Sequence, residues 1–194
     1  MARILRRVSA PASLPITLTE VKAHLRVEHT DDDTYLNSLI AAVVGFTDVE
    51  GALGRAMITQ TWQQYVSPKP KTVTLLATPV QSVVSVKYYD IDGALQTDTL
   101  SNYDVFGSPD FTTIRPKKTK AWPDTQIRDD AIIIEYVIGY GSASDVPATT
   151  KHAMLMLVGH WYDNRENELI GTISKTLPYG FEELISIERG SWYG

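Results

Sequence analysis

The most regular pattern of apolar positions lies in residues 147–166. They follow the i, i+3, i+4, i+7 spacing of one helical face. Asp145 can cap the start of this helix, and Pro147 suits its first turn, where a missing N–H costs nothing. Because the face is broad for a surface helix, we expect it to lie in a bundle core, at a subunit interface, or both. The face comprises Met154, Leu155, Leu157, Val158, Trp161 and Tyr162.

Two shorter helical patterns come earlier in the chain. Thr17 and Glu20 stand three residues apart, as in a capping box, and predict a helix over residues 17–27. Three aspartates at 31–33 open a second helix, where negative charge complements the helix dipole. We expect these two helices to form an αα-hairpin.

The second helix has an apolar period of 3.6 residues that starts at Leu36. The pattern continues past Gly45 towards Leu53. Gly54 is then a natural terminator, because glycine readily adopts the left-handed conformation that ends many helices.

Between residues 58 and 140 the pattern changes to short runs of β-branched and aromatic residues, which predict strands. An apolar run at 131–138 predicts a central, buried strand. Residues 90–93, Asp-Ile-Asp-Gly, predict a hairpin turn but lack the remaining ligands of a calcium loop. We expect an antiparallel sheet or small sandwich. The predicted strands are 58–66, 73–77, 83–89, 94–100, 103–106, 112–115 and 131–138.

These patterns predict an α+β protein. A small helical bundle, made of the αα-hairpin and the long C-terminal helix, would carry an inserted antiparallel β-sheet domain and extended termini. The arginine-rich first residues would be either a frayed terminus or a strap that orders on a partner. The expected division is an N-terminal arm at 1–16, a bundle at 17–57 and 145–168, a β region at 58–144 and a C-terminal tail at 169–194.

The amino-acid composition excludes several kinds of functional site. The chain has 194 residues, a formal net charge of −5 and no cysteine. The lack of cysteine excludes disulfides, cysteine-ligated zinc and thiol catalysis. No apolar run approaches the ~20 residues that cross a bilayer, and the basic N-terminus lacks the apolar segment of a secretory signal. We therefore expect synthesis in the cytoplasm and no membrane association.

The sequence contains no recognisable catalytic motif. Neither G-x-S-x-G nor H-E-x-x-H occurs, and no nucleophile, base and orienting group form a set. His160 and Asp163 stand three residues apart on the long helix, but such a pair is a weak sign of metal binding. We expect no catalytic, metal-binding or cofactor-binding residues and no cofactor.

A basic cluster lies near Trp122. Phosphate contact with base stacking is one interpretation of such a cluster, and a solvated loop is the plainer one, because the protein is acidic overall. We keep the cluster as a weak DNA-contact candidate. Its lysines are Lys117, Lys118 and Lys120.

Several longer motifs resemble, in this order and along nearly the whole chain, the head–tail connector (adaptor) proteins of long-tailed phages. Similar proteins occur in prophages and in phage-derived gene transfer agents. The motifs are LTEVKAHLRV at 18–27, the aspartates at 31–33, ITQTW at 58–62, VVSVKYYDIDG at 83–93, WP at 122–123, GYG at 139–141, VP at 146–147, HWYDNRE at 160–166 and LPYGF at 177–181.

The resemblance implies structural work rather than catalysis. Such proteins form rings, commonly of twelve copies, beneath the portal of the DNA-filled head. They join the portal to the next neck or tail protein, and double-stranded DNA passes through the centre without sequence-specific contact. The implied location is the virion neck, after synthesis in the cytoplasm of a bacterial host. A net negative charge suits a channel wall, because attraction to phosphates would retard passing DNA.

A ring subunit needs two different adhesive faces. Trp161, Tyr162 and Arg165 are candidates for the subunit interface, because aromatic residues and arginine commonly anchor interfaces. The tail has more apolar residues than an exposed segment usually carries, so we expect it to dock on the portal. Its candidates are Leu177, Tyr179, Phe181, Leu184, Ile185, Ile187, Trp192 and Tyr193.

Two alternatives remain open at this point. The protein could be a stopper or tail-completion ring of the same neck, which would bind only after an adaptor is in place. It could also be an enzyme that acts through His160 and Asp163.

Overall fold

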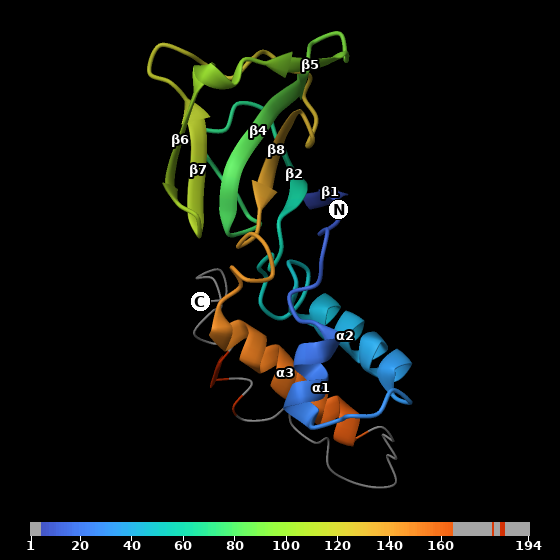
Figure 1. Ribbon diagram of the computed structural model, residues 1–194. Coiled ribbons are helices and arrows are strands. Elements are labelled where there is room, and N and C mark those ends of the chain that lie inside the picture. The colour runs from blue at the N-terminus through green and yellow to red at the C-terminus, as the bar shows by residue number, and fades with distance from the viewer. Residues whose placement is uncertain (1–4, 165–179, 181–182, 185–194) are drawn as a thin grey trace, which may run out of the picture. The chain divides into compact units, whose positions relative to one another are not determined.

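The computed structural model describes residues 5–164, 180, 183 and 184 of the chain (Figure 1). As predicted, the described part is an α+β protein, with α-helices and antiparallel sheets of five and three strands. The backbone divides into two compact units. The β unit contains the described residues up to Ala12 and Ile58–Tyr140, and the helical unit contains Ser13–Met57 and the described residues from Gly141.

The larger sheet has strand β8 at its centre (Figure 1). Ile134 of β8 pairs with Gln64 on one side and Val86 on the other, and all three side chains are buried. The prediction of a central strand from the apolar run at 131–138 is therefore confirmed. In spatial order the strands are β1 (Leu5–Ser9), β2 (Gln60–Val66), β8 (Ile132–Ile138), β4 (Val80–Tyr89) and β5 (Leu95–Asp98).

The smaller sheet is tied to the larger one by a buried glutamine. The Gln64 side chain donates to the Thr74 carbonyl at 3.0 Å and accepts from the Leu76 N–H at 2.9 Å. The Tyr136 hydroxyl accepts from the Ala77 N–H at 3.1 Å, and burial raises the pKa of Tyr136. These bonds satisfy backbone groups that would otherwise be buried without partners. The sheet contains β3 (Val73–Thr74), β7 (Phe111–Pro116) and β6 (Tyr103–Ser108), and a short 3-10 helix, Leu100–Asn102, precedes β6.

The N-terminal segment differs from the expected free arm. Leu5–Ser9 forms strand β1, which pairs antiparallel with β2. The Ser9 hydroxyl oxygen also accepts from the Thr61 N–H at 3.0 Å. The strand was missed because its side chains, except the half-buried Leu5, are exposed, so no alternation marks it. Its order comes from the free edge of β2, which offers unpaired backbone groups.

The turn between β4 and β5 confirms the prediction for residues 90–93. The Asp90 carboxylate accepts from the Gln96 side chain at 2.8 Å and from the Ala94 and Asp92 N–H groups at 2.9 and 3.0 Å. These bonds, the one from Gln96 first, lower the pKa of Asp90. Gly93 has φ +84°, a conformation that favours glycine.

The helical unit contains three packed helices, α1 (Leu18–Leu25), α2 (Asp33–Thr47) and α3 (Ala148–Asp163), shown in Figure 1. Each turns an apolar face towards the others, as the sequence period predicts. The face of α3 is confirmed as a packing face. The buried apolar side chains of the three helices are Val21, Leu36, Leu39, Ile40, Val43, Ala153, Met154, Leu157 and Val158.

The predicted end of α2 is wrong. The helix ends at Thr47, because the chain turns back and the Ala52 N–H donates to the Phe46 carbonyl at 2.6 Å. Gly51 permits this return, since a Cβ there would lie only 2.1 Å from the same carbonyl oxygen. A glycine three residues earlier than Gly54 is therefore the one that the turn requires.

The predicted cap of α3 is also wrong. Pro147 occupies the N-cap position and makes no side-chain cap bond. The Asp145 carboxylate instead accepts from the Ser142 hydroxyl and N–H, each at 2.7 Å. These two bonds lower the pKa of Asp145. The aspartate therefore orders the loop before the helix and leaves the helix end uncapped by a side chain.

The predicted capping box at α1 is confirmed, and it carries a stability prediction. The Glu20 N–H donates to the Thr17 hydroxyl at 3.2 Å, and the Thr17 N–H donates to the Glu20 carboxylate at 2.7 Å. Thr17→Ala should therefore lower the free energy of unfolding by about 1 kcal/mol. Urea denaturation followed by circular dichroism measures the change. Thr17→Ser, which keeps the hydroxyl, should remain near wild type; equal losses for both variants would contradict a capping role.

Candidate functional site

The aromatic residues at the end of α3 contact α2 and its N-cap residue. Trp161 lies edge-on to Phe46, with ring centroids 6.2 Å apart. The Tyr162 hydroxyl donates to the Asp32 carboxylate, and its ring lies 6.2 Å from that of Tyr35. Trp161 and Tyr162 are half-buried, and Phe46 is 36% exposed. The predicted interface residues are thus partly used inside the unit, and their role between subunits stays a prediction.

Most of the predicted portal-docking residues, together with Arg165, lie outside the described residues. Leu184 is described, and it is helical and half-buried. Gly180 lies against α3, since a Cβ on it would come within 3.0 Å of the Met156 methyl carbon. At that point the tail therefore contacts its own helical unit. The residues outside the description are Arg165, Leu177, Tyr179, Phe181, Ile185, Ile187, Trp192 and Tyr193.

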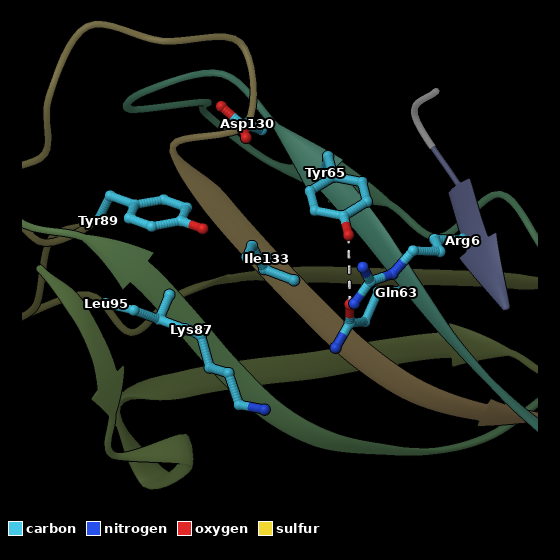
Figure 2. Close-up of a pocket in the computed structure, with 8 residues that line it drawn as sticks. All are labelled: Arg6, Gln63, Tyr65, Lys87, Tyr89, Leu95, Asp130 and Ile133. Atoms are coloured by element: carbon cyan, nitrogen blue, oxygen red, sulfur yellow. Dashed lines mark hydrogen bonds between the residues drawn. The ribbon is translucent and has the colours of Figure 1, made fainter. Parts of the chain in front are cut away.

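One face of the five-stranded sheet is hollowed, with a cavity of about 530 Å³. Side chains from five strands line it, because alternate residues of paired strands point to the same face. Figure 2 shows these side chains above the strands, with Arg6, Gln63 and Tyr65 close together on one side and Tyr89 on the other. We call it the sheet-face hollow. Its lining residues are Arg6, Gln63, Tyr65, Lys87, Tyr89, Leu95, Asp130 and Ile133.

A chain of hydrogen bonds crosses this face from β1 to β4. The Gln63 amide oxygen accepts from the Arg6 guanidinium at 2.9 Å and from the Tyr65 hydroxyl at 3.3 Å. The Gln63 amide nitrogen donates to the Glu135 carboxylate at 2.7 Å, and Lys87 donates to the same carboxylate oxygen at 3.3 Å. The bonds attach the edge strand β1 to the middle of the sheet. They also compensate the one carboxylate at its centre.

A second group of charges lies at the rim of the sheet-face hollow. The Arg128 guanidinium donates to the Asp130 carboxylate at 2.5 and 2.7 Å and lies 3.8 Å from the Tyr89 ring centroid. This partner lowers the pKa of Asp130. A carboxylate held in its ionised form is a poor general acid at neutral pH. Asp130 therefore stays a carboxylate, paired with Arg128, at the rim of the sheet-face hollow.

A different hollow, of about 740 Å³, contains the basic cluster predicted near Trp122. Two loops of the β unit form it: one follows β2 and the other follows β7. The first loop adds Lys69 and Lys71, which the sequence analysis did not connect with the cluster. Their distance along the chain hid the connection. We call this site the lysine hollow. Its lysines are Lys69, Lys71, Lys117, Lys118 and Lys120.

The β6–β7 hairpin exposes apolar side chains. Val105, Phe106 and Phe111 are 45%, 43% and 56% exposed. The Arg115 guanidinium lies 4.7 Å from the Phe106 ring centroid. β6 is also the edge strand of its sheet. An exposed edge strand with apolar side chains is a typical place for contact with another chain.

The described residues supply little that could hold a metal ion. Within residues 5–164 and the few described positions beyond them, no group of three histidine, cysteine, aspartate or glutamate side chains is placed for coordination. His160 and Asp163 thus have no third ligand among these residues. Among the described helices, none combines the length and the apolar content that crossing a bilayer requires.

Solved structures with the same fold come from gene transfer agent particles. A chain from the neck of an empty gene transfer agent (GTA) particle, computed with C6 symmetry, matches with a TM-score of 0.71 at 20% identity and covers 96% of this chain and 95% of that one. A chain from the neck of a native GTA particle, computed with C12 symmetry, matches with a TM-score of 0.68 at 22% identity over the same shares. At this level of identity the two matches establish the fold.

A third match and the family comparison agree with these two. A chain from the virion of a native gene transfer agent particle has a TM-score of 0.67 at 20% identity, covering 96% of this chain and 95% of that one. No curated protein matches the sequence. The family model described as "Head completion protein" matches residues 15–176. This confirms the resemblance to head–tail connectors: the match spans most of the sequence, and the chain belongs to the head completion protein family.

Proposed function

We propose that the protein is a structural component of a virion neck, an adaptor that forms a ring beneath the portal. The ring would join the DNA-filled head to the tail and surround the path of the exiting DNA. The observation that carries the proposal is the match of the whole fold to a neck chain in a particle with C12 symmetry, within a family of head completion proteins. The C12 symmetry of that particle supports a ring of twelve copies for this chain.

The surfaces of the two units offer what such a ring requires. A closed ring is built from heterologous contacts, so each copy must present two different faces. The Phe46–Trp161 pair and the apolar β6–β7 hairpin are two exposed patches on different units. Aromatic residues flanked by arginine, as at Phe106 and Arg115, are common anchors of protein interfaces. We assign these two patches to contacts between neighbouring copies.

The tail, residues 169–194, is the proposed attachment to the portal. Removing it should leave ring formation intact and abolish binding to the portal. Native mass spectrometry of the purified protein, alone and mixed with its portal, measures both properties. The proposed function would be overturned if the wild-type protein stayed monomeric at high concentration and did not bind the portal.

A point variant separates docking from folding in this experiment. The truncation also removes Gly180, which lies against Met156 of α3. Trp192→Ala with Tyr193→Ala keeps that contact and should still weaken portal binding. Normal portal binding by the truncated protein would exclude the tail as the attachment, whatever the point variant does.

Two alternatives make different predictions. A stopper or tail-completion ring should bind portal only when an adaptor is already present, so the order of addition distinguishes it from an adaptor. An enzyme acting through His160 and Asp163 should lose its activity when both are replaced by alanine. Normal particle assembly by that double variant would favour the structural role.

A further inference from the structure

We propose that the lysine hollow binds the phosphate backbone of double-stranded DNA without sequence preference. The inference deepens the proposed function and rests on it for one point, the presence of DNA at the ring. It assigns a DNA-contact site to one part of a protein whose formal net charge is −5. The charge, the backbone geometry and the lining of the hollow each support it.

The first support is an imbalance of charge. Outside the lysine hollow, the described lysines are all in ion pairs: Lys22 with Asp33, Lys87 with Glu135 and Lys151 with Glu20. Inside it, only Lys69 has such a partner in the described part of the chain, Asp124 at 2.8 Å. The other lysines of the hollow, Lys71, Lys117, Lys118 and Lys120, are exposed and make no ion pair with a described residue. Uncompensated like charges in one hollow attract a polyanion.

The second support is the local backbone, which holds the lysines of the second loop together. The Lys117 N–H donates to the Asn102 carbonyl at 2.9 Å, and the Lys120 N–H donates to the Lys117 carbonyl at 2.8 Å. Pro116 precedes this turn and Pro70 separates the two lysines of the other loop. Proline restricts the backbone and so lowers the entropy that binding would cost. The charges are therefore presented by short, constrained loops.

The third support concerns the kind of anion. The lining contains lysines but no arginine, asparagine or glutamine. Lysine binds phosphate as a point charge, whereas arginine adds a two-pronged contact with carboxylates and phosphates alike. Arginine, asparagine and glutamine are also the usual readers of base edges. The chemistry thus fits the sugar–phosphate backbone and provides no means of reading sequence.

The state of Trp122 favours a duplex over a single strand. Single-strand binding proteins stack bases on accessible aromatic rings. Trp122 is only 8% exposed, and its ring lies 5.0 Å from that of Tyr103 by centroids. The ring is therefore occupied in the core of the β unit and offers no stacking platform. Base stacking on Trp122, which the sequence left open, does not fit this arrangement.

The expected binding is weak and depends strongly on salt. If the four lysines that pair with no described residue neutralise up to four phosphates, the slope of log affinity against log salt is no steeper than about −3.6. Non-specific affinities of this type lie at about 10⁻⁴–10⁻⁶ M near physiological salt. In a ring, several copies would act on one duplex. Weak contacts of this kind hold DNA near the wall without fixing its position.

A matched pair of double variants tests the inference on the full-length protein. Lys71→Gln with Lys118→Gln removes two charges from the lysine hollow, and Arg26→Gln with Lys151→Gln removes two charges from the helical unit. Fluorescence anisotropy with a short labelled duplex of random sequence measures binding at low and near-physiological salt. The first variant should bind about tenfold more weakly and show a shallower salt slope. The second should stay within about twofold of wild type, because both of its substituted residues lie outside the lysine hollow.

Additional variants and measurements distinguish the possible reasons for a loss of DNA binding. Lys71→Arg with Lys118→Arg keeps the charge and should keep the affinity. Equal losses in the two Gln variants would reduce the effect to net charge and overturn the inference, as would displacement of the duplex by a polyglutamate peptide at lower concentration. Circular dichroism confirms folding, and native mass spectrometry reports ring formation in each variant. If the wild-type protein forms rings but binds no duplex, the DNA-binding inference is wrong and the proposed function stands. If the wild-type protein forms no ring, the proposed function is wrong.

Discussion

Replacing Trp62 with alanine is expected to lower the free energy of unfolding by about 3–5 kcal/mol. Trp62 is 2% exposed and lies on β2 opposite Tyr136 of β8, in the part of the β unit where the two sheets meet. Its indole N–H donates to the Gln60 side chain at 3.1 Å. Alanine would leave a large cavity and an amide oxygen without its donor, and both effects are unfavourable. Urea denaturation followed by far-ultraviolet circular dichroism provides the measurement.

Trp62→Phe is the matched control for this experiment. Phenylalanine keeps most of the volume and loses only the hydrogen bond to Gln60, so the loss should be about 1–3 kcal/mol. A loss for alanine no larger than that for phenylalanine would show that the buried volume at Trp62 does not stabilise the sheet.

The second large effect is expected at Gly139, directly after β8. Its φ is +116°, and a Cβ there would lie 2.5 Å from the Ile58 carbonyl oxygen and 2.8 Å from the Thr59 nitrogen. Both neighbours are backbone atoms, so they can move only if the start of β2 moves as well. Gly139→Ala should lower the free energy of unfolding by about 3 kcal/mol or more, from backbone strain together with this displacement.

Gly45 offers a control with the opposite sign. It lies inside α2, and a Cβ there would have no atom within 4 Å. Gly45→Ala should raise the free energy of unfolding by about 0.5–1 kcal/mol, because alanine loses less backbone entropy in a helix. If both glycine variants destabilise equally, the close approach at Gly139 is not the cause of its effect.

Much of the fold was predictable because short-range signals agree with the long-range packing. The apolar run at 131–138 is buried on both faces, so its pattern needs no knowledge of the neighbouring strands. The capping box at Thr17 and the turn at Asp90 depend on residues close together in the sequence. The apolar face of α3 follows from its period alone, and its members Met154, Leu157 and Val158 are buried.

The features that were missed depend on partners far away in the chain. β1 has an exposed, mostly polar sequence and becomes a strand only because β2 has a free edge. Glutamine is usually exposed, so the sequence suggests a surface position for Gln64. It is buried because the backbone of residues 74–76 supplies its hydrogen bonds. Lys69 joins Lys117 in one hollow although their positions in the sequence lie far apart. Neither periodicity nor spacing contains such information.

The same limit applies to the candidate sites. The basic cluster was found because three lysines are close in sequence, but its extent and the occupied ring of Trp122 required the fold. The sheet-face hollow had no signal in the sequence, because its side chains come from strands that pair only in space. Trp161 was predicted as an anchor from its type, and its contact with Phe46 could not be derived from the helix period.

The chain passes between its two units after Ala12, after Met57 and after Tyr140. Neither unit is therefore one continuous stretch of sequence. A fragment of residues 58–140 would lack β1 and would leave the edge of β2 open to pairing with foreign strands. Recombination that exchanged only that fragment between related genes would separate a sheet from its outermost strand. Successful exchange of the β unit must carry the codons of residues 5–12 along with those of residues 58–140.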